Sequence, residues 1–161
     1  MTLSITEANL EHPDDATAIV TLLQAYAEEM MGAGKTLPSA VTDRIIPGLK
    51  AVHGCLVLLA RFDGAPAGLA ISFPGFSTWK ASPLLNLHDL AVNARFRGLG
   101  VGRKLLNEVE RHARSRGCCR LTLEVYEENH RAKQLYLSEG FHPGDPPQEF
   151  WTKPLESTDA I

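Results

Sequence analysis

The chain has 161 residues, of which 44% are hydrophobic and 22% charged, so the composition is that of a folded globular protein rather than a disordered one. A formal net charge of −3 provides no basic surface for nucleic acid. The longest apolar run, Cys55–Ala60, is far shorter than the roughly 20 residues that span a bilayer. We therefore expect no nucleic-acid partner and no membrane partner.

Three cysteines without a C-x-x-C pair indicate neither a disulfide framework nor a zinc ribbon, which favours a reducing, cytoplasmic location. The histidines show no metal-ligand spacing, and no metal is expected. The length predicts a single domain over residues 1–155, followed by a frayed tail at 156–161.

The first half of the chain begins with a strand and two helices. Alternation at Leu3–Ala8 predicts the strand, and Pro13 stands where a helix can begin without losing a hydrogen bond. A weaker helix is expected between Pro38 and Val52. Pro47 and Gly48 are expected to interrupt it or split it in two.

A hairpin is expected next. Cys55–Phe62 and Pro66–Phe73 have strand composition, and Asp63-Gly64 between them is a favoured turn dipeptide. Pro74-Gly75 is expected to end the second strand, and Leu84–Val92 is again strand-like.

The second half continues as an α/β pattern. Apolar residues recur at helical spacing over 101–113, and Arg120–Tyr126 alternates as a strand. A last helix should begin near Asn129. Phe141 and Phe150–Leu155 are candidates for closing strands.

A cluster of glycines separates the Leu84–Val92 strand from the following helix. Gly98, Gly100 and Gly102 permit backbone angles closed to other residues, and the first turn of a helix offers N–H groups without internal acceptors. Together with Arg97 and Arg103 they favour binding of a phosphate group. The P-loop pattern G-x-x-x-x-G-K-S/T is absent and the dinucleotide pattern G-x-G-x-x-G fails, which excludes the two commonest nucleotide loops.

Two segments resemble the GNAT superfamily of N-acetyltransferases. Arg97 to Gly102 matches its pyrophosphate loop, Arg/Gln-x-x-Gly-x-Gly/Ala. The downstream segment N-x-x-A-x-x-L-Y-x-x-x-G-F is matched in order by Asn129, Ala132, Leu135, Tyr136, Gly140 and Phe141. The chain is also similar, before the glycine loop, to diamine and thialysine acetyltransferases of that superfamily.

The resemblance implies an α+β fold: a mixed, mostly antiparallel central sheet that splays between its fourth and fifth strands, flanked by about four helices. Acetyl-CoA would lie in the gap as cosubstrate, with its pantetheine arm along the fourth strand. The residues implied in cofactor binding are Leu90, Ala91, Val92, Arg97, Gly98, Leu99, Gly100, Val101, Gly102, Arg103 and Asn129.

The resemblance also implies direct transfer of the acetyl group to an amine in a ternary complex. Tyr136 is expected to be the general acid for the departing thiolate. The base is left open between His88, Glu124 and a chain of water molecules. Strict alternation places His88 and Asp89 on opposite faces of their strand, unless a bulge intervenes.

The acceptor is expected to be a primary amine of a small molecule, polyamine or amino-acid-like. Phe76, Trp79 and Asp89 are candidates for binding it, by cation–π contact and charge. Exposed Phe76 and Trp79 suit the interface of a homodimer equally well. Acetylation of a protein amino terminus or lysine, and a non-catalytic acetyl-CoA sensor, are the alternative functions.

Overall fold

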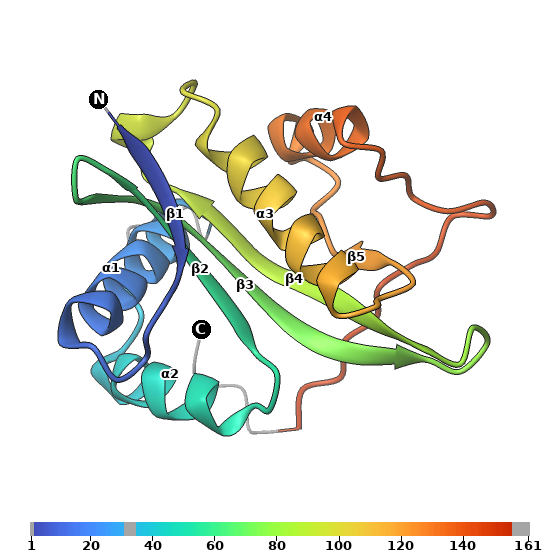
Figure 1. The fold of residues 1–161 in the computed structure, drawn as a ribbon, viewed down its shortest axis with the longest axis horizontal. Helices are drawn as coiled ribbons and strands as arrows, with labels where there is room; N and C mark the ends of the chain where they lie inside the picture. Colours follow the sequence, from blue (N-terminus) through green and yellow to red (C-terminus); the bar gives the residue numbers. More distant parts are fainter. Residues whose placement is uncertain (1, 31–34, 156–161) are drawn as a thin grey trace. The chain divides into compact units, whose positions relative to one another are not determined.

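The structure, a computed structural model, describes residues 2–30 and 35–155. It consists of two compact units, Met1–Leu123 and Glu124–Ile161, called the first and second unit below. The elements of the first unit are β1 (Leu3–Glu7), α1 (Pro13–Met30), α2 (Ser39–Ala51), β2 (Leu56–Phe62), β3 (Ala65–Ser77), β4 (Ser82–Val92), a 3₁₀ turn (Ala94–Phe96), α3 (Val101–Ser115) and β5 (Leu121–Leu123) (Figure 1). The second unit contains α4 (His130–Ser138).

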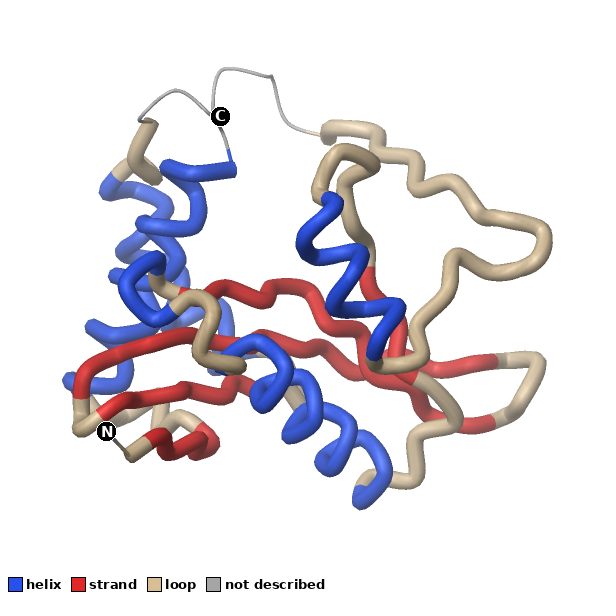
Figure 2. Tube along the Cα trace, turned by 90° about the horizontal axis from the view of Figure 1, so that it is seen from above, coloured by secondary structure: helices blue, strands red, loops and turns tan. Residues whose placement is uncertain are grey.

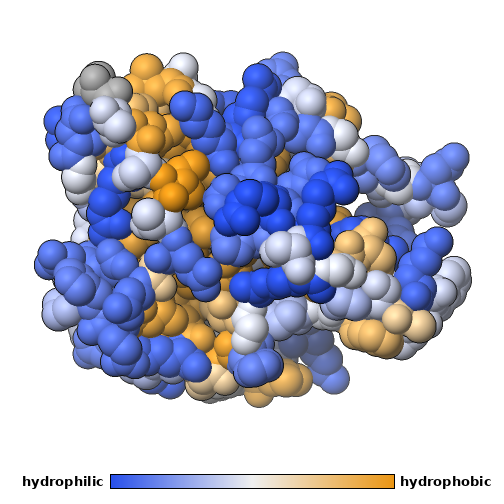
Figure 3. Space-filling view, viewed as in Figure 1, coloured by the Kyte–Doolittle hydropathy of each residue, from blue (hydrophilic) through white to orange (hydrophobic). Residues whose placement is uncertain are grey.

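The five strands form one sheet in the order β1-β2-β3-β4-β5, in which only the β4–β5 pair is parallel. Helices α1 and α2 cover one face of the sheet and α3 covers the other (Figure 2). On the side of α3, hydrophilic residues dominate the helix surface, and apolar residues appear beside it over β1 and β2 (Figure 3). The mixed, mostly antiparallel sheet with helices on both faces confirms the α+β fold predicted from the sequence.

The hairpin between β2 and β3 forms as predicted, because Asp63 (φ +46°) and Gly64 (φ +86°) adopt the left-handed angles of a mirror-image turn. The predicted break at Pro74-Gly75 is wrong, since β3 continues to Ser77. The ladder to β2 begins where Leu56 pairs with Ser72, so Pro74 lies where β3 has become an edge strand. A proline is tolerated there because its missing N–H removes no ladder bond.

Helix α2 is continuous, so the predicted interruption at Pro47 is also wrong. A proline inside a helix costs about 3 kcal/mol. Ile45, Ile46 and Leu49 of the same helix pack against the core cluster under α1, and burial of such side chains contributes about 1.5–3 kcal/mol each when complete. Tertiary packing therefore outweighs the local cost.

Strand β5 covers only Leu121–Leu123 of the predicted Arg120–Tyr126 segment. In the second unit, the residues at Phe141 and Phe150–Leu155 form no strand, which corrects the prediction of closing strands. Apolar composition suggests a strand, but a strand needs a neighbour to complete its hydrogen bonds. Phe141 instead packs against Tyr136, with 5.9 Å between ring centroids.

Helix α3 lies close to the sheet at Gly68 of β3. A Cβ at this position would stand 2.8 Å from the Ala91 carbonyl oxygen and 3.2 Å from side-chain carbons of Val101 and Leu105. Val101 and Leu105 are fully buried and lie in the first turns of α3. The lack of a side chain at Gly68 therefore sets how closely the amino-terminal end of α3 approaches β3.

We predict that Gly68→Ala destabilises the fold by about 1–3 kcal/mol, because the new methyl group meets backbone as well as side chains. Gly48→Ala is the matched control: its added Cβ meets nothing within 4 Å, and alanine favours the interior of α2 by about 0.5–1 kcal/mol. Urea unfolding of both variants measures the difference. Equal stabilities would contradict the close approach of α3.

Candidate functional site

A β-bulge interrupts β4 in the middle of the sheet. Ser72 pairs with Leu87 and the adjacent Ile71 pairs with Asp89, so His88 is the extra residue. The His88 ring lies 5.3 Å from that of Phe73, and Phe73 packs on the side of α1 and α2. His88 and Asp89 therefore both face that side. The bulge that the sequence analysis named as the exception to strict alternation is therefore present, and it shifts the phase of β4 at these two residues.

The backbone of β4 is open beyond the bulge. Pairing with β5 covers Leu85–Leu87 only, so among the described residues His88–Val92 have no strand partner on that edge. On the other edge, Gly68 pairs with Val92 and Ala70 with Leu90. The predicted splay between the fourth and fifth strands is confirmed. An extended ligand with amide groups can add to such an edge as a further strand.

The open strand leads directly into the glycine turn. Gly98 and Gly100 both have φ of +77°, the left-handed region in which glycine is favoured, and Gly100 caps α3 without any side-chain hydrogen bond. A Cβ added at either glycine would meet nothing within 4 Å. The space around both glycines is therefore open at the positive end of the α3 dipole, and the amino-terminal end of a helix with such a turn is an arrangement that can bind anions.

Four polar contacts hold this turn in place. The Asn93 N–H donates to the Ala67 carbonyl at 2.9 Å, and the Asn93 side chain accepts a hydrogen bond from the Arg95 N–H at 3.0 Å. The Arg97 Nε donates to the Val92 carbonyl at 3.1 Å, and its Nη2 pairs with Glu29 of α1. Arg97, which the sequence assigns to phosphate binding, thus also ties the end of β4 to α1.

A cavity of about 270 Å³ is lined by residues from α1, α2 and the sheet. Its apolar lining comprises Leu23, Ile45, Leu49, Val52, Ile71 and Phe73. Asp89 from β4 and Arg44 from α2 are the charged residues among those that line it. Burial raises the pKa of the Asp89 carboxyl, and the nearby His88 opposes that shift in part.

The raised pKa of Asp89 predicts a pH-dependent gain in stability for Asp89→Asn. In the folded protein the pKa of Asp89 lies above the ordinary value of 3.8, so the folded state binds the proton more tightly than the unfolded state does. The protonated carboxyl therefore favours folding at low pH, and this contribution to stability is lost as pH rises through the folded-state pKa. At pH 7 the variant should melt a few degrees higher than the wild type, and the gain should vanish near pH 4. A variant that is less stable at pH 7 would contradict the cost of the buried charge.

Phe76 and Trp79 lie on the β3–β4 hairpin, away from the cavity lining. Their exposed fractions are 62% and 98%, and neither lines the cavity. Asp89, the third residue that the sequence suggested for acceptor binding, does line it. The lining residues Arg44 and Ile45 carry no sequence motif, and only the packing of α2 against the sheet identifies them.

Glu124, Asn129 and Tyr136 belong to the second unit. The Asn129 side chain accepts a hydrogen bond from the Ala132 N–H at 3.1 Å and so caps α4. Tyr136 is half-buried on the same helix, and Glu124 is exposed. The capping contact gives Asn129 a structural role that the sequence motif did not indicate.

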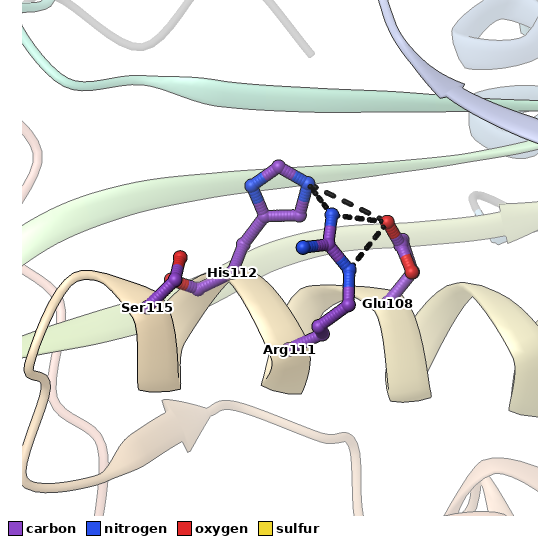
Figure 4. A network of polar contacts seen from close by, with 4 residues as sticks. All are labelled: Glu108, Arg111, His112 and Ser115. Atoms are coloured by element: carbon purple, nitrogen blue, oxygen red, sulfur yellow. Dashed lines mark hydrogen bonds and ion pairs between the residues drawn. The ribbon is translucent and has the colours of Figure 1, made fainter.

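A polar cluster on α3 has a structural explanation. Arg111 donates two hydrogen bonds to Glu108, at 3.0 and 2.6 Å, and its guanidinium also lies 3.0 Å from the His112 ring, while Ser115 bonds back to the helix (Figure 4). The hydrogen bond from Arg111 lowers the pKa of Glu108. Pairs at this spacing stabilise a helix surface.

Among the described residues no three His, Cys, Asp or Glu side chains are gathered closely enough to hold a metal ion. None of the helices in the described part of the chain is both long and apolar enough to cross a membrane.

The sequence profile of the Acetyltransferase (GNAT) family matches residues 19–141. The chain therefore belongs to this family and is an N-acetyltransferase. Members of the family use acetyl-CoA as cosubstrate. The open edge of β4 and the uncapped amino terminus of α3 fit that molecule, because they offer main-chain groups to an amide-bearing arm and to a diphosphate.

Curated relatives include two proteins that align over most of their length. A thialysine N-epsilon-acetyltransferase of Caenorhabditis elegans is 29% identical over 77% of this chain and 75% of that protein. An uncharacterized N-acetyltransferase of Bacillus subtilis is 28% identical over 79% of this chain and 83% of that protein. The thialysine N-epsilon-acetyltransferase of Bos taurus is 36% identical, over 45% of this chain and 42% of that protein.

Solved structures share the fold. A probable acetyltransferase superimposes with a TM-score of 0.78 at 24% identity, covering 96% of this chain and 99% of the other. An aminoglycoside acetyltransferase from an uncultured soil metagenomic sample, in complex with trehalose, has a TM-score of 0.75 at 16% identity, covering 98% and 97%. At these identities the likeness concerns the fold alone.

Proposed function

We propose that this N-acetyltransferase transfers the acetyl group of acetyl-CoA to a primary amine of a small molecule, by direct transfer in a ternary complex. The observation that carries the proposal is the continuity of the open β4 edge with the glycine turn, within one unit and beside the cavity that Asp89 enters. When bound, acetyl-CoA supplies the activated acetyl group. The names of the thialysine acetyltransferase relatives support a small amine as acceptor.

In this proposal the chain holds the cosubstrate mainly through its backbone. Main-chain groups of Leu90, Ala91 and Val92 receive the pantetheine arm as an added strand. The N–H groups from Gly98 to Arg103 bind the diphosphate, with the positive end of the α3 dipole adding favourable potential. Leu99 and Val101 contribute backbone groups of the same turn. Asn129 contributes a polar contact, as the resemblance implies.

We assign the two proton transfers of the reaction, and the stabilisation of charge on the thioester oxygen, to three residues of the chain. His88, at the bulge, accepts the proton that the acceptor amine loses, directly or through water, since histidine is a base suited to neutral pH. The Leu90 N–H stabilises negative charge on the thioester oxygen. Tyr136 donates a proton to the departing sulfur. Glu124 and a water chain remain the alternative bases.

The size of the cavity favours a small acceptor over a bulky one. A volume of about 270 Å³ is slightly below the range of roughly 300–1,000 Å³ that small-molecule sites occupy. A short aliphatic amine can lie along its apolar walls, with its ammonium group drawn to the Asp89 carboxylate.

A substitution in the glycine turn tests the proposed function. Gly100→Leu should weaken CoA binding at least about tenfold in calorimetry, because a side chain blocks the approach of a phosphate to the backbone. Gly117→Leu is the matched control: Gly117 also has a positive φ, of +68°, with nothing within 4 Å of an added Cβ, but it lies at the other end of α3. The strain in the two variants is therefore similar.

Wild-type CoA affinity in Gly100→Leu would contradict the assignment of the turn. The same preparations are assayed for acetyl transfer to a panel of polyamines, amino acids and lysine peptides. Turnover with a free small amine supports the proposal. Turnover restricted to peptides favours a protein acetyltransferase, and tight CoA binding without turnover favours a sensor.

We further predict that Tyr136→Phe lowers kcat about 10- to 100-fold, because the phenolic proton is lost while the ring remains. The Kd for CoA should stay within about twofold of the wild type. Tyr126→Phe, which alters a tyrosine that is 68% exposed, controls for loss of a hydroxyl elsewhere in the second unit. A wild-type kcat in Tyr136→Phe would remove the acid role.

A further inference from the structure

We propose that Glu29 of α1 holds the Arg97 guanidinium before the cosubstrate binds, and that the diphosphate of the cosubstrate displaces it. Glu29 thereby lowers the affinity for donors that reach Arg97 through a diphosphate, and it leaves the affinity for donors without one unchanged. The inference deepens the proposed function and rests on it, because it assumes that the glycine turn binds the diphosphate.

The Arg97 guanidinium has two partners within the first unit. Its Nε donates to the Val92 carbonyl at 3.1 Å, and its Nη2 pairs with the Glu29 carboxylate. The side chains of Arg97 and Glu29 are 35% and 44% exposed, so water screens the ion pair and it is weak enough to be exchanged. A diphosphate carries more charge than a carboxylate and accepts two parallel hydrogen bonds from a guanidinium, which makes it the stronger partner.

The Val92 carbonyl lies on the open edge of β4. Asn93 stands opposite Ala67 and donates its N–H to the Ala67 carbonyl at 2.9 Å, as in a hydrogen-bonded pair of an antiparallel ladder. Hydrogen-bonded and non-hydrogen-bonded pairs alternate, so the main-chain groups of the next pair, Val92 and Gly68, point away from each other. The Val92 carbonyl therefore faces the edge that has no strand partner among the described residues, and Arg97 covers it there.

The ion pair also fills the space between α1 and the end of β4. A groove at this place is lined by both members of the pair, by Tyr26 of α1 and by Val92 of β4. With the pair closed, the groove measures about 10 Å³, which is about what a single water molecule needs. An anion that contacts Arg97 from this side must therefore replace the Glu29 carboxylate.

Two exchanges of partner follow when Arg97 turns to a diphosphate. The guanidinium exchanges a carboxylate for phosphate oxygens, and the Val92 carbonyl exchanges the guanidinium for an amide N–H of the pantetheine arm. Glu29 is exposed, so water solvates its carboxylate after the exchange. No buried polar group is left without a partner, which keeps the cost of the exchange small. The free energy needed to break the pair nevertheless reduces the affinity for the cosubstrate.

The test measures binding of three ligands in calorimetry, without an acceptor amine: CoA, dephospho-CoA, which keeps the diphosphate, and pantetheine, which lacks it. Glu29→Gln should tighten binding of CoA and dephospho-CoA about three- to tenfold, because the competing carboxylate is removed. The Kd for pantetheine should stay within about twofold of the wild type. The gain for CoA should shrink at high ionic strength, which screens exposed charges.

Arg97 must be present for Glu29 to have its effect. Arg97→Gln alone should weaken CoA binding, and adding Glu29→Gln to it should change the Kd for CoA by less than about twofold, because the two residues act through one contact. A full gain from Glu29→Gln in the Arg97→Gln background would contradict competition for the guanidinium.

Glu28→Gln provides the matched control. Glu28 is the adjacent acidic residue of α1 and is also exposed, but it neither lines the groove nor forms the ion pair with Arg97. Its substitution removes the same charge and should leave the Kd for CoA within about twofold of the wild type. Unchanged or weaker CoA binding in Glu29→Gln, or an equal gain in Glu28→Gln or for pantetheine, would overturn the inference and leave the proposed function intact. A wild type that binds no CoA would overturn the proposed function itself.

Discussion

Unpaired main-chain hydrogen-bonding groups are the constraint on which this structure depends. Backbone N–H and C=O groups in a folded protein almost always have partners, yet among the described residues no strand pairs with one edge of β4 from His88 to Val92. The Val92 carbonyl there accepts a hydrogen bond from Arg97, and the strand leads into the first turn of α3, which has no side-chain cap at Gly100. The bulge at His88 and the early end of β5 at Leu123 produce this opening together. A ligand that carries amides and a diphosphate can satisfy both parts of it.

Stability and function are linked at the same strand. Gly68 lets α3 approach β3 closely beside its pairing with Val92 of β4, which fixes the position of the turn that precedes the helix. The hairpin and the core under α1 and α2 support β4 from the other side. Against that rigid background the protein retains a half-buried carboxyl group at Asp89, whose charged form is disfavoured by burial. A destabilising group that is held in place by well-packed neighbours is typical of a functional site.

Much of the fold could be predicted from local patterns, and the failures share one cause. The Asp63-Gly64 turn and the helix after Gly100 follow from short-range rules of backbone geometry. The errors arose where tertiary contacts determine the local structure. Pro47 is tolerated because α2 packs on the core, and Pro74 is tolerated because β3 no longer pairs with β2 at that position. The bulge at His88 also depends on how β4 pairs with β3, and the sequence of one strand alone does not determine that pairing.

The candidate site shows the same division. The glycine turn has a motif because particular φ angles require glycine, whereas Arg44 lines the cavity only through the packing of α2 and has no signature.

The central claim is that backbone groups of β4 and the turn bind the cosubstrate. Hydrogen–deuterium exchange with and without saturating CoA tests it most directly. We expect slower exchange in peptides that cover residues 88–104. Protection confined to other peptides, with none there, would contradict the account.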